Sequence, residues 1–237
     1  MIPKIVHLCW FSNDPYPLEI KVCLDSWKRI IPDYEVKIWG YKEAKAIGCE
    51  FIDEALEERR WAFAADVVRF YAVYKYGGLY MDSDIFLFKR FDRFCAEKGF
   101  VTFNEVVNPD TSEFGLQAAF FMGEAGNALC KEVFEYYNNS HYRNSDGTLN
   151  NTISPLVMAR IAEKKFGYKQ DDIYQDLGEI KIYPTRFLAP RKKYKIDDET
   201  FGMHRVYGNW KKRKFGRKVE IWIKHQLLVV RYALLKK

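Results

Sequence analysis

Apolar residues along the chain follow two alternating patterns. Short runs of β-branched and aromatic residues predict strands, and segments in which apolar residues recur every three to four positions predict helices. Because the two kinds of segment alternate, we expect an α/β fold with a mostly parallel central sheet covered by helices on both faces. The strands are expected at 4–10, 35–39, around 79–81, 100–104, 117–122, 180–184 and 201–206, and the helices at 17–30, 53–60, 61–76, 127–137 and 155–166.

The helix predicted at 61–76 is apolar on almost every side, which is typical of a buried helix. Between Trp61 and Tyr74 its only charged residues are Asp66 and Arg69, which share one face because they are three residues apart. A buried ion pair with a purely structural role is one interpretation, but such pairs stabilise a fold poorly because desolvation offsets their attraction. A role in a functional site is therefore the favoured interpretation.

A second unusual feature follows this helix and the glycines Gly77 and Gly78, in the stretch "YGGLYMDSDIF". Asp82 and Asp84 stand one residue apart between apolar residues. In an extended strand their side chains point to the same side, with backbones about 7 Å apart. Two such carboxylates repel unless a cation lies between them or one is protonated, and Mg²⁺ or Mn²⁺ prefers oxygen ligands of this kind. The alternative is an acidic turn between two strands, but the apolar context favours a metal site.

Three further residues could belong to such a site. Trp10 ends the first predicted strand, where ligands bind in open α/β sheets, and its indole could stack on a base. A core tryptophan is equally compatible with this position. His204, in "FGMHRVYGNW", could complete a metal site as a neutral imidazole, although a lone histidine is more often structural. Trp210 in the same stretch is open to both interpretations.

Composition supports a globular protein in a reducing compartment. The chain has 237 residues, of which 48% are hydrophobic and 17% aromatic, enough for one sizeable core. Its five cysteines form no C-x-x-C pair, which indicates free thiols. We expect no signal peptide at the N-terminus, and no uncharged apolar run is long enough to span a bilayer.

Charge divides the chain into two parts. Residues 211–237 contain ten Lys or Arg and one acid, a charge of +9, so the overall +6 leaves −3 for residues 1–210. The same tail is rich in apolar residues, which predicts a basic amphipathic C-terminal helix on an anionic membrane surface. The alternative is a helix packed on the domain with a solvated basic face. We therefore expect one folded domain at 1–210 and a separate tail at 211–237.

Several stretches together resemble glycosyltransferase family 32, the DXD-motif sugar transferases of capsular polysaccharide and lipopolysaccharide synthesis, with a remote similarity to the clostridial glucosylating toxins. These stretches are "IPKIVHLCWF", "CLDSWKRIIPDYEVKIW", "AADVVRFYAVYKYGGLYMDSD" and the late His…Trp segment. The resemblance covers about the first 90 residues and resumes at His204–Trp210. It implies a GT-A-like fold, a nucleotide-sugar donor that is a UDP-sugar, and a Mn²⁺ or Mg²⁺ ion between the DXD motif and the donor diphosphate. It also implies that the anomeric configuration is retained.

The resemblance implies roles for particular residues on the donor side of the site. Trp10 would stack on the nucleotide base. Asp66 would hold hydroxyl groups of the donor, and Arg69 would reach its sugar or phosphate groups.

It implies further roles around the metal ion. Asp82 would contact the ribose and the metal shell, Asp84 would bind the metal directly, and His204 would complete the metal site. His204 and Trp210 would also close the site over the diphosphate. Many family members have Ser before this tryptophan, and Asn209 can still donate a hydrogen bond to a phosphate oxygen.

The implied function is a cytoplasmic transferase on the inner face of the cell membrane, acting on a glycan or lipid-linked glycan acceptor. One alternative is a haloacid-dehalogenase-like phosphohydrolase, but that class carries D-x-D after its first strand, with Thr or Val two residues beyond, where this chain has Phe86. Another alternative is a non-enzymatic basic nucleic-acid-binding protein. Its phosphate-backbone partner would be repelled by the −3 charge of residues 1–210, so no nucleic acid is expected.

Overall fold

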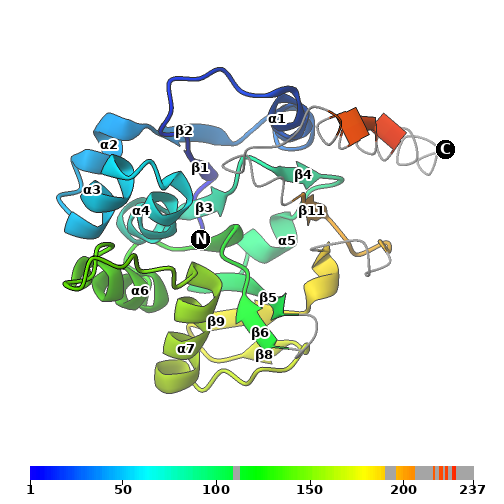
Figure 1. Cartoon of the computed structure of the whole chain (residues 1–237). Helices are drawn as coiled ribbons and strands as arrows, with labels where there is room; N and C mark the ends of the chain where they lie inside the picture. The colour runs from blue at the N-terminus through cyan, green and yellow to red at the C-terminus, as the bar shows by residue number, and fades with distance from the viewer. Residues whose placement is uncertain are drawn as a thin grey trace.

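The computed structural model describes residues 1–108, 113–189 and 196–205, together with residues 216, 219, 220, 222, 223, 226 and 227. Strands alternate with single helices or groups of helices in the first half of the chain, whereas the elements between residues 175 and 204 are mostly short strands (Figure 1). The elements in chain order are β1 (Ile5–Cys9), α1 (Leu18–Ile30), β2 (Glu35–Trp39), α2 (Tyr41–Lys45), α3 (Glu50–Glu57), α4 (Trp61–Tyr76), β3 (Gly78–Met81), β4 (Ile85–Leu87), α5 (Asp92–Cys95), β5 (Phe100–Asn108), β6 (Glu113–Leu116), β7 (Phe120–Gly123), α6 (Ala128–Asn138), α7 (Ser154–Phe166), β8 (Gln175–Asp176), β9 (Ile180–Tyr183), the 3₁₀ helix η1 (Thr185–Phe187), β10 (Leu188–Ala189) and β11 (Gly202–His204).

The main sheet has eight strands in the order β2-β1-β3-β7-β5-β9-β8, with β6 paired to β5. Parallel pairing joins β1 to β2 and β3, and β5 to β9. Strand β7 runs antiparallel to both of its neighbours, so the sheet is mixed at its centre and parallel in its N-terminal part. Three short strands, β10-β11-β4, form a second sheet beside it.

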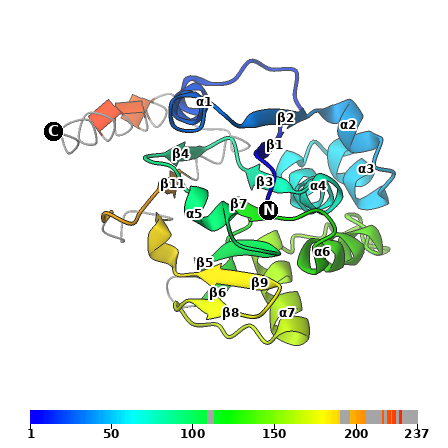
Figure 2. The ribbon, with the colours of Figure 1, turned by 180° about the vertical axis from the view of Figure 1, so that it is seen from behind.

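Helices cover both faces of the sheet, as the alternation of segments predicts. In Figures 1 and 2, α3, α4 and α6 lie together on one side, while α1, α5 and the small sheet lie on the other. The side chains of β3 follow this division: Tyr80 packs into the core beneath α4, whereas Leu79 and Met81 pack into the opposite core with Trp27 of α1. Such alternation is what an extended strand between two cores requires.

The glycines after α4 are required by geometry. Gly77 ends the helix at φ 65°, and Gly78 follows at φ 98°, where a side chain is strained. A Cβ at Gly78 would also lie 2.5 Å from the Ile5 carbonyl oxygen of β1. The pair therefore lets a buried helix turn directly into the strand that precedes the two aspartates.

The cysteines agree with the expectation of free thiols. All five cysteines are free thiols, and all but Cys9 are buried. Within the part of the chain that the structure describes, no helix has both the length and the apolar character needed to cross a bilayer.

Candidate active site

A cavity of about 750 Å³ opens where β1 and β3 end. Its wall is built from segments far apart in the sequence: the loop after β1, the buried helix α4, the turn after β3, the residues before β7, the start of α7 and the end of β11. The residues that line it include Trp10, Phe11, Asp14, Arg59, Trp61, Ala62, Ala65, Asp66, Arg69, Tyr80, Asp82, Asp84, Glu105, Gln117, Ala118, Ala119, Ser154 and His204.

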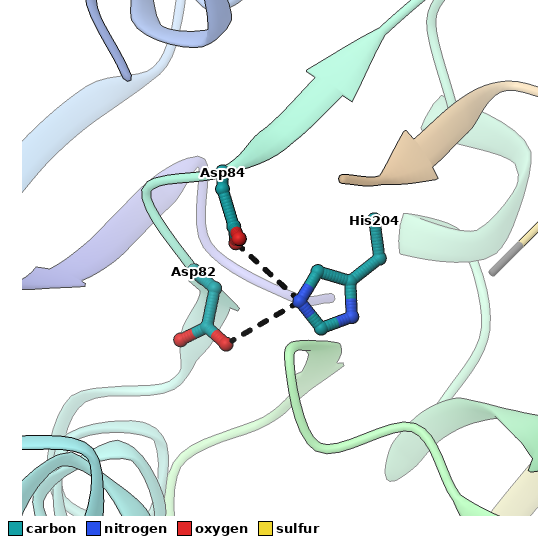
Figure 3. Close-up of side chains that lie close together, drawn as sticks. All are labelled: Asp82, Asp84 and His204. Carbon is teal, nitrogen blue, oxygen red and sulfur yellow. Dashed lines mark ion pairs between the residues drawn. The ribbon is translucent and has the colours of Figure 1, made fainter. Parts of the chain in front are cut away.

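Asp82 and Asp84 lie in a tight turn between β3 and β4, not in an extended strand. The Ile85 amide donates to the Asp82 carbonyl at 3.0 Å, and the Asp82 amide donates to the Ala119 carbonyl at 2.8 Å. The second of these bonds continues the pairing of β3 with β7, whereas the first closes a turn over Asp82–Ile85, so the predicted extended geometry is wrong. The side chains still point toward His204 (Figure 3), and both aspartates line the cavity.

His204 completes a cluster with the two aspartates. Strand β11 pairs antiparallel with β4, which places His204 opposite Ile85 and next to the turn. Its Nε2 lies 3.4 Å from Asp84 Oδ1 and 4.0 Å from Asp82 Oδ2 (Figure 3). One ligand atom from each of the three residues lies within 4.8 Å of the others.

The electrostatics of this cluster favour a cation. Burial alone would lower the pKa of His204, but the carboxylates of Asp84, Asp82 and Glu105 outweigh it and raise the pKa to about 9. The Nδ1 atom of the same ring is buried without a hydrogen-bond partner among the described residues. Two carboxylate oxygens and one imidazole nitrogen form a donor set that suits a divalent ion such as Mn²⁺, so the residues present fit a metal site.

The two oxygens of Asp82 have different surroundings. Oδ1 accepts a hydrogen bond of 2.6 Å from the Tyr80 hydroxyl and lies 3.6 Å from Arg69 Nη2. Oδ2 faces His204. Burial raises the pKa of Tyr80 well above its usual value, so the phenol remains a donor. Tyr80 thus orients Asp82 with one oxygen toward the metal cluster.

Arg69 connects this turn to the buried helix. Its Nη2 lies 2.9 Å from Asp66 Oδ1, its Nε donates to the Ala65 carbonyl at 2.9 Å, and its Nη1 donates to the Ala118 carbonyl at 2.7 Å. Its guanidinium also lies 4.6 Å from the centre of the Tyr80 ring. The predicted Asp66–Arg69 pair is therefore present. It is part of a larger network that includes the turn carrying Asp82 and Asp84 (the DXD turn).

Asp66 borders the cavity although it is only 9% exposed. Burial raises the pKa of its carboxyl group, with Arg69 and a 2.7 Å hydrogen bond from Ser154 Oγ acting in the opposite direction. These two partners hold the carboxylate at the cavity wall, where it can accept hydrogen bonds from a ligand.

Trp10 lies at the edge of the cavity and is half-buried, unlike the core tryptophans Trp27 and Trp39. Its indole N–H donates to the Asp14 carbonyl at 3.0 Å, and its ring centre is 4.6 Å from that of Tyr16. These contacts fix an aromatic surface beside the cavity. The other expected residues of the site, Asn209 and Trp210, lie outside the described residues.

Comparison with known proteins bears directly on this geometry. Residues 17–101 match the family described as "Glycosyltransferase sugar-binding region containing DXD motif". This part of the chain is similar to DXD glycosyltransferase regions. It contains Asp66, Arg69, Asp82 and Asp84, whereas His204 comes from outside it. The expected relationship to DXD sugar transferases is thereby confirmed, and family 32 fits it.

A sequence relative agrees with the family match. The chain is 33% identical over 98 residues to inositol phosphoceramide mannosyltransferase 3 of Schizosaccharomyces pombe. That match covers 35% of this chain and 24% of the relative, so it spans about a quarter of the length of the mannosyltransferase.

The likeness of fold to one solved structure extends beyond the matched region. The PaToxG glycosyltransferase superimposes with a TM-score of 0.55 at 16% identity, covering 70% of each chain, which confirms the predicted glycosyltransferase-type α/β fold. A glycosyltransferase involved in glycosylation of the major capsid of PBCV-1 gives a TM-score of 0.45 at 14% identity, over 87% of this chain and 96% of that one.

The cavity also contains residues that the sequence analysis missed, and all three lie outside residues 17–101. Ser154 begins α7 and reaches Asp66 across 88 positions of sequence, a distance at which pattern analysis has no signal. Glu105 was visible as an acid inside the apolar run of β5. Gln117 is buried, and its side-chain oxygen accepts from the Ala119 amide next to the DXD turn.

Proposed function

We propose that the protein is a metal-dependent glycosyltransferase that transfers a sugar from a UDP-sugar to a glycan or lipid-linked glycan acceptor. The observation that carries this proposal is the convergence of Asp82, Asp84 and His204 on one cavity wall. The match of residues 17–101 to the DXD family supports the reaction class. The phosphohydrolase alternative is disfavoured because the D-x-D motif follows β3 and not the first strand.

The metal would be held by Asp82 Oδ2, Asp84 Oδ1 and His204 Nε2. A bound divalent cation supplies Lewis-acid stabilisation of the negative charge that develops on a departing nucleoside diphosphate.

The chain's own residues would orient the donor. Asp66, fixed by Ser154 and Arg69, is placed to accept hydrogen bonds from donor hydroxyls. Arg69 adds a buried positive charge between Asp66 and Asp82. Trp10 offers a flat surface for the base. By resemblance to family 32, His204 and Trp210 would close the site over the diphosphate, and the product would retain the anomeric configuration of the donor.

The test is release of UDP from a panel of UDP-sugars, with Mn²⁺, with Mg²⁺ and with EDTA. We expect turnover only with a divalent ion, and ¹H NMR of the first product to show the anomer of the donor. A parallel thermal-shift screen of UDP- and GDP-sugars with Mn²⁺ identifies the donor, because a ligand of the native state raises stability. Turnover that ignores EDTA would contradict the proposal.

We further propose that residues 1–210 form the catalytic domain and that 211–237 bind an anionic membrane surface at the cytoplasmic side. The described residues of this tail are helical, and the apolar ones are exposed: Val219 at 39%, Trp222 at 44%, Ile223 at 46% and Leu227 at 64%. Their spacing places them on one helical face, which supports an amphipathic surface helix.

Co-sedimentation with vesicles tests the tail. The full chain should pellet with phosphatidylglycerol vesicles at low salt, release as salt screens the charges, and ignore phosphatidylcholine vesicles. A chain lacking residues 217–237 should stay in the supernatant and keep hydrolysing the nucleotide sugar. Equal binding of the two chains would overturn this assignment.

A further inference from the structure

The junction between α3 and α4 has an unusual backbone. Glu58 caps α3, and Arg59 follows with φ 52°. The Arg59 amide donates to the Leu56 carbonyl at 3.0 Å, and the Arg60 amide donates to the Ala55 carbonyl at 2.8 Å. These two hydrogen bonds are the pair that defines a Schellman motif, and Arg59 occupies its left-handed position.

Glycine is the usual residue at that position, because a Cβ there is strained. Among the described residues, nine have a positive φ: eight of them are glycines, and the ninth is Arg59. Strain of this type persists mainly where the side chain has a function. An arginine in place of glycine therefore points to a use for its guanidinium.

The position of Arg59 indicates what that use is. It lines the active-site cavity together with Trp61 and Ala62, and it is exposed. The ring centres of Trp61 and Phe11 are 6.4 Å apart, so the junction meets the loop after β1 that begins with Trp10. Within residues 1–108, 113–189 and 196–205, no carboxylate lies at ion-pair distance from the Arg59 guanidinium.

Resting on the proposed function, we propose that Arg59 binds the base of the donor nucleotide. A planar guanidinium presents a fork of N–H donors, and the edge of a pyrimidine base such as uracil presents carbonyl acceptors. The aromatic residues that a base would contact, Trp10 and Trp61, line the same cavity. The diphosphate, by contrast, has its own partners in the metal cluster and Arg69.

Two substitutions separate the strain from the guanidinium. Arg59→Ala keeps the strained Cβ and removes the guanidinium, whereas Arg59→Gly removes both. Arg60→Gly is the matched control, because it deletes a neighbouring exposed arginine at φ −90° that does not line the cavity. Isothermal titration with UDP, and separately with pyrophosphate, both in the presence of Mn²⁺, measures binding, and a thermal scan without ligand measures stability.

We expect both Arg59 variants to bind UDP at least about 10-fold more weakly than the wild-type protein, because each loses hydrogen bonds from a charged donor to the base. Pyrophosphate binding should stay unchanged, because that ligand has no base. Arg59→Gly alone should also melt about 2–4 °C higher than the wild-type protein. Arg60→Gly should match the wild-type protein in both titrations.

The outcomes distinguish this inference from the proposed function. A wild-type protein that binds no UDP with Mn²⁺ overturns both. A wild-type protein that binds UDP, together with Arg59→Ala that binds it equally well, overturns the role of Arg59 alone. Equal weakening of UDP and pyrophosphate would place Arg59 on the phosphates and would overturn its role at the base.

Discussion

His7 makes the stability of the fold depend on pH in a way that can be calculated. The ring is fully buried in β1, and both nitrogens are used. Its Nε2 donates to the Gly77 carbonyl at 2.8 Å, while its Nδ1 accepts from the Trp39 indole N–H at 3.2 Å. A second proton would have to occupy Nδ1, where the Trp39 donor already points. Burial, with a smaller contribution from Lys37, accordingly lowers the pKa of His7 to about 4, although the Gly77 hydrogen bond opposes the shift.

The sign of the effect follows from linkage. In the unfolded chain the pKa is 6.5, so between pH 6.5 and pH 4 the unfolded state binds a proton that the folded state excludes. Acidification therefore destabilises the fold in this window. The loss is about 2 kcal/mol from pH 7 to pH 5 and about 3 kcal/mol in full. His7 contacts the turn from α4 into β3, and β3 leads directly to Asp82 and Asp84. The loss of stability therefore affects the strands that hold the DXD turn in place.

Urea unfolding at pH 7, 6 and 5 measures the effect. His7→Gln is the variant of choice, since an amide can donate to Gly77 and accept from Trp39 without titrating. We expect the free energy of unfolding of the wild-type protein to fall, relative to His7→Gln, by about 2 kcal/mol between pH 7 and pH 5. Trp39→Phe removes the opposing donor and should make this difference smaller. Parallel pH profiles for the wild-type protein and His7→Gln would refute the reasoning.

Three further predictions concern the active site. Asp84→Ala should abolish transfer and the Mn²⁺-dependent rise in melting temperature, and a variant that keeps either would exclude Asp84 as a metal ligand. Tyr80→Phe should weaken Mn²⁺ binding about 10-fold in a titration, because Asp82 loses the hydrogen-bond donor that orients it. Wild-type affinity for Mn²⁺ in this variant would contradict the prediction. Asp66→Asn should lower turnover at least about 10-fold while the protein stays folded by circular dichroism. Normal turnover per folded molecule would make the Asp66–Arg69 pair purely structural.

Local patterns were enough to predict much of the framework. The apolar character of α4 predicted its burial, and the double glycine predicted its end, because both depend on residues next to one another in the sequence. The position of the carboxylate pair on the cavity wall was also predictable. Its geometry was not, since the chain turns at Asp82–Ile85 where the pairing of β3 with β7 ends, and that pairing is set by tertiary structure.

Long-range pairing accounts for most of what the sequence could not reveal. The sequence predicts a strand at 201–206 and His204 as a candidate ligand, but not the pairing of β11 with the three-residue strand β4 that brings His204 to the site. Ser154 reaches Asp66 only because α7 packs beside β5 and β6. In both cases the chemistry of the residue was visible in the sequence, whereas its partner was determined by tertiary structure.

The charges inside α4 make physical sense only as part of the whole network. An isolated Asp66–Arg69 pair would stabilise the fold little, because desolvation of both groups offsets their attraction. Arg69 instead contacts Asp66, Asp82 and the carbonyls of Ala65 and Ala118, so one buried cation balances two carboxylates and joins α4, the DXD turn and the segment before β7. The fixed fork of a guanidinium can serve these directions at once, whereas an ammonium group would act as a point charge. The buried helix thus aligns the carboxylate proposed to hold donor hydroxyls with the carboxylate proposed to hold the metal, and this alignment accounts for both charges in an otherwise apolar helix.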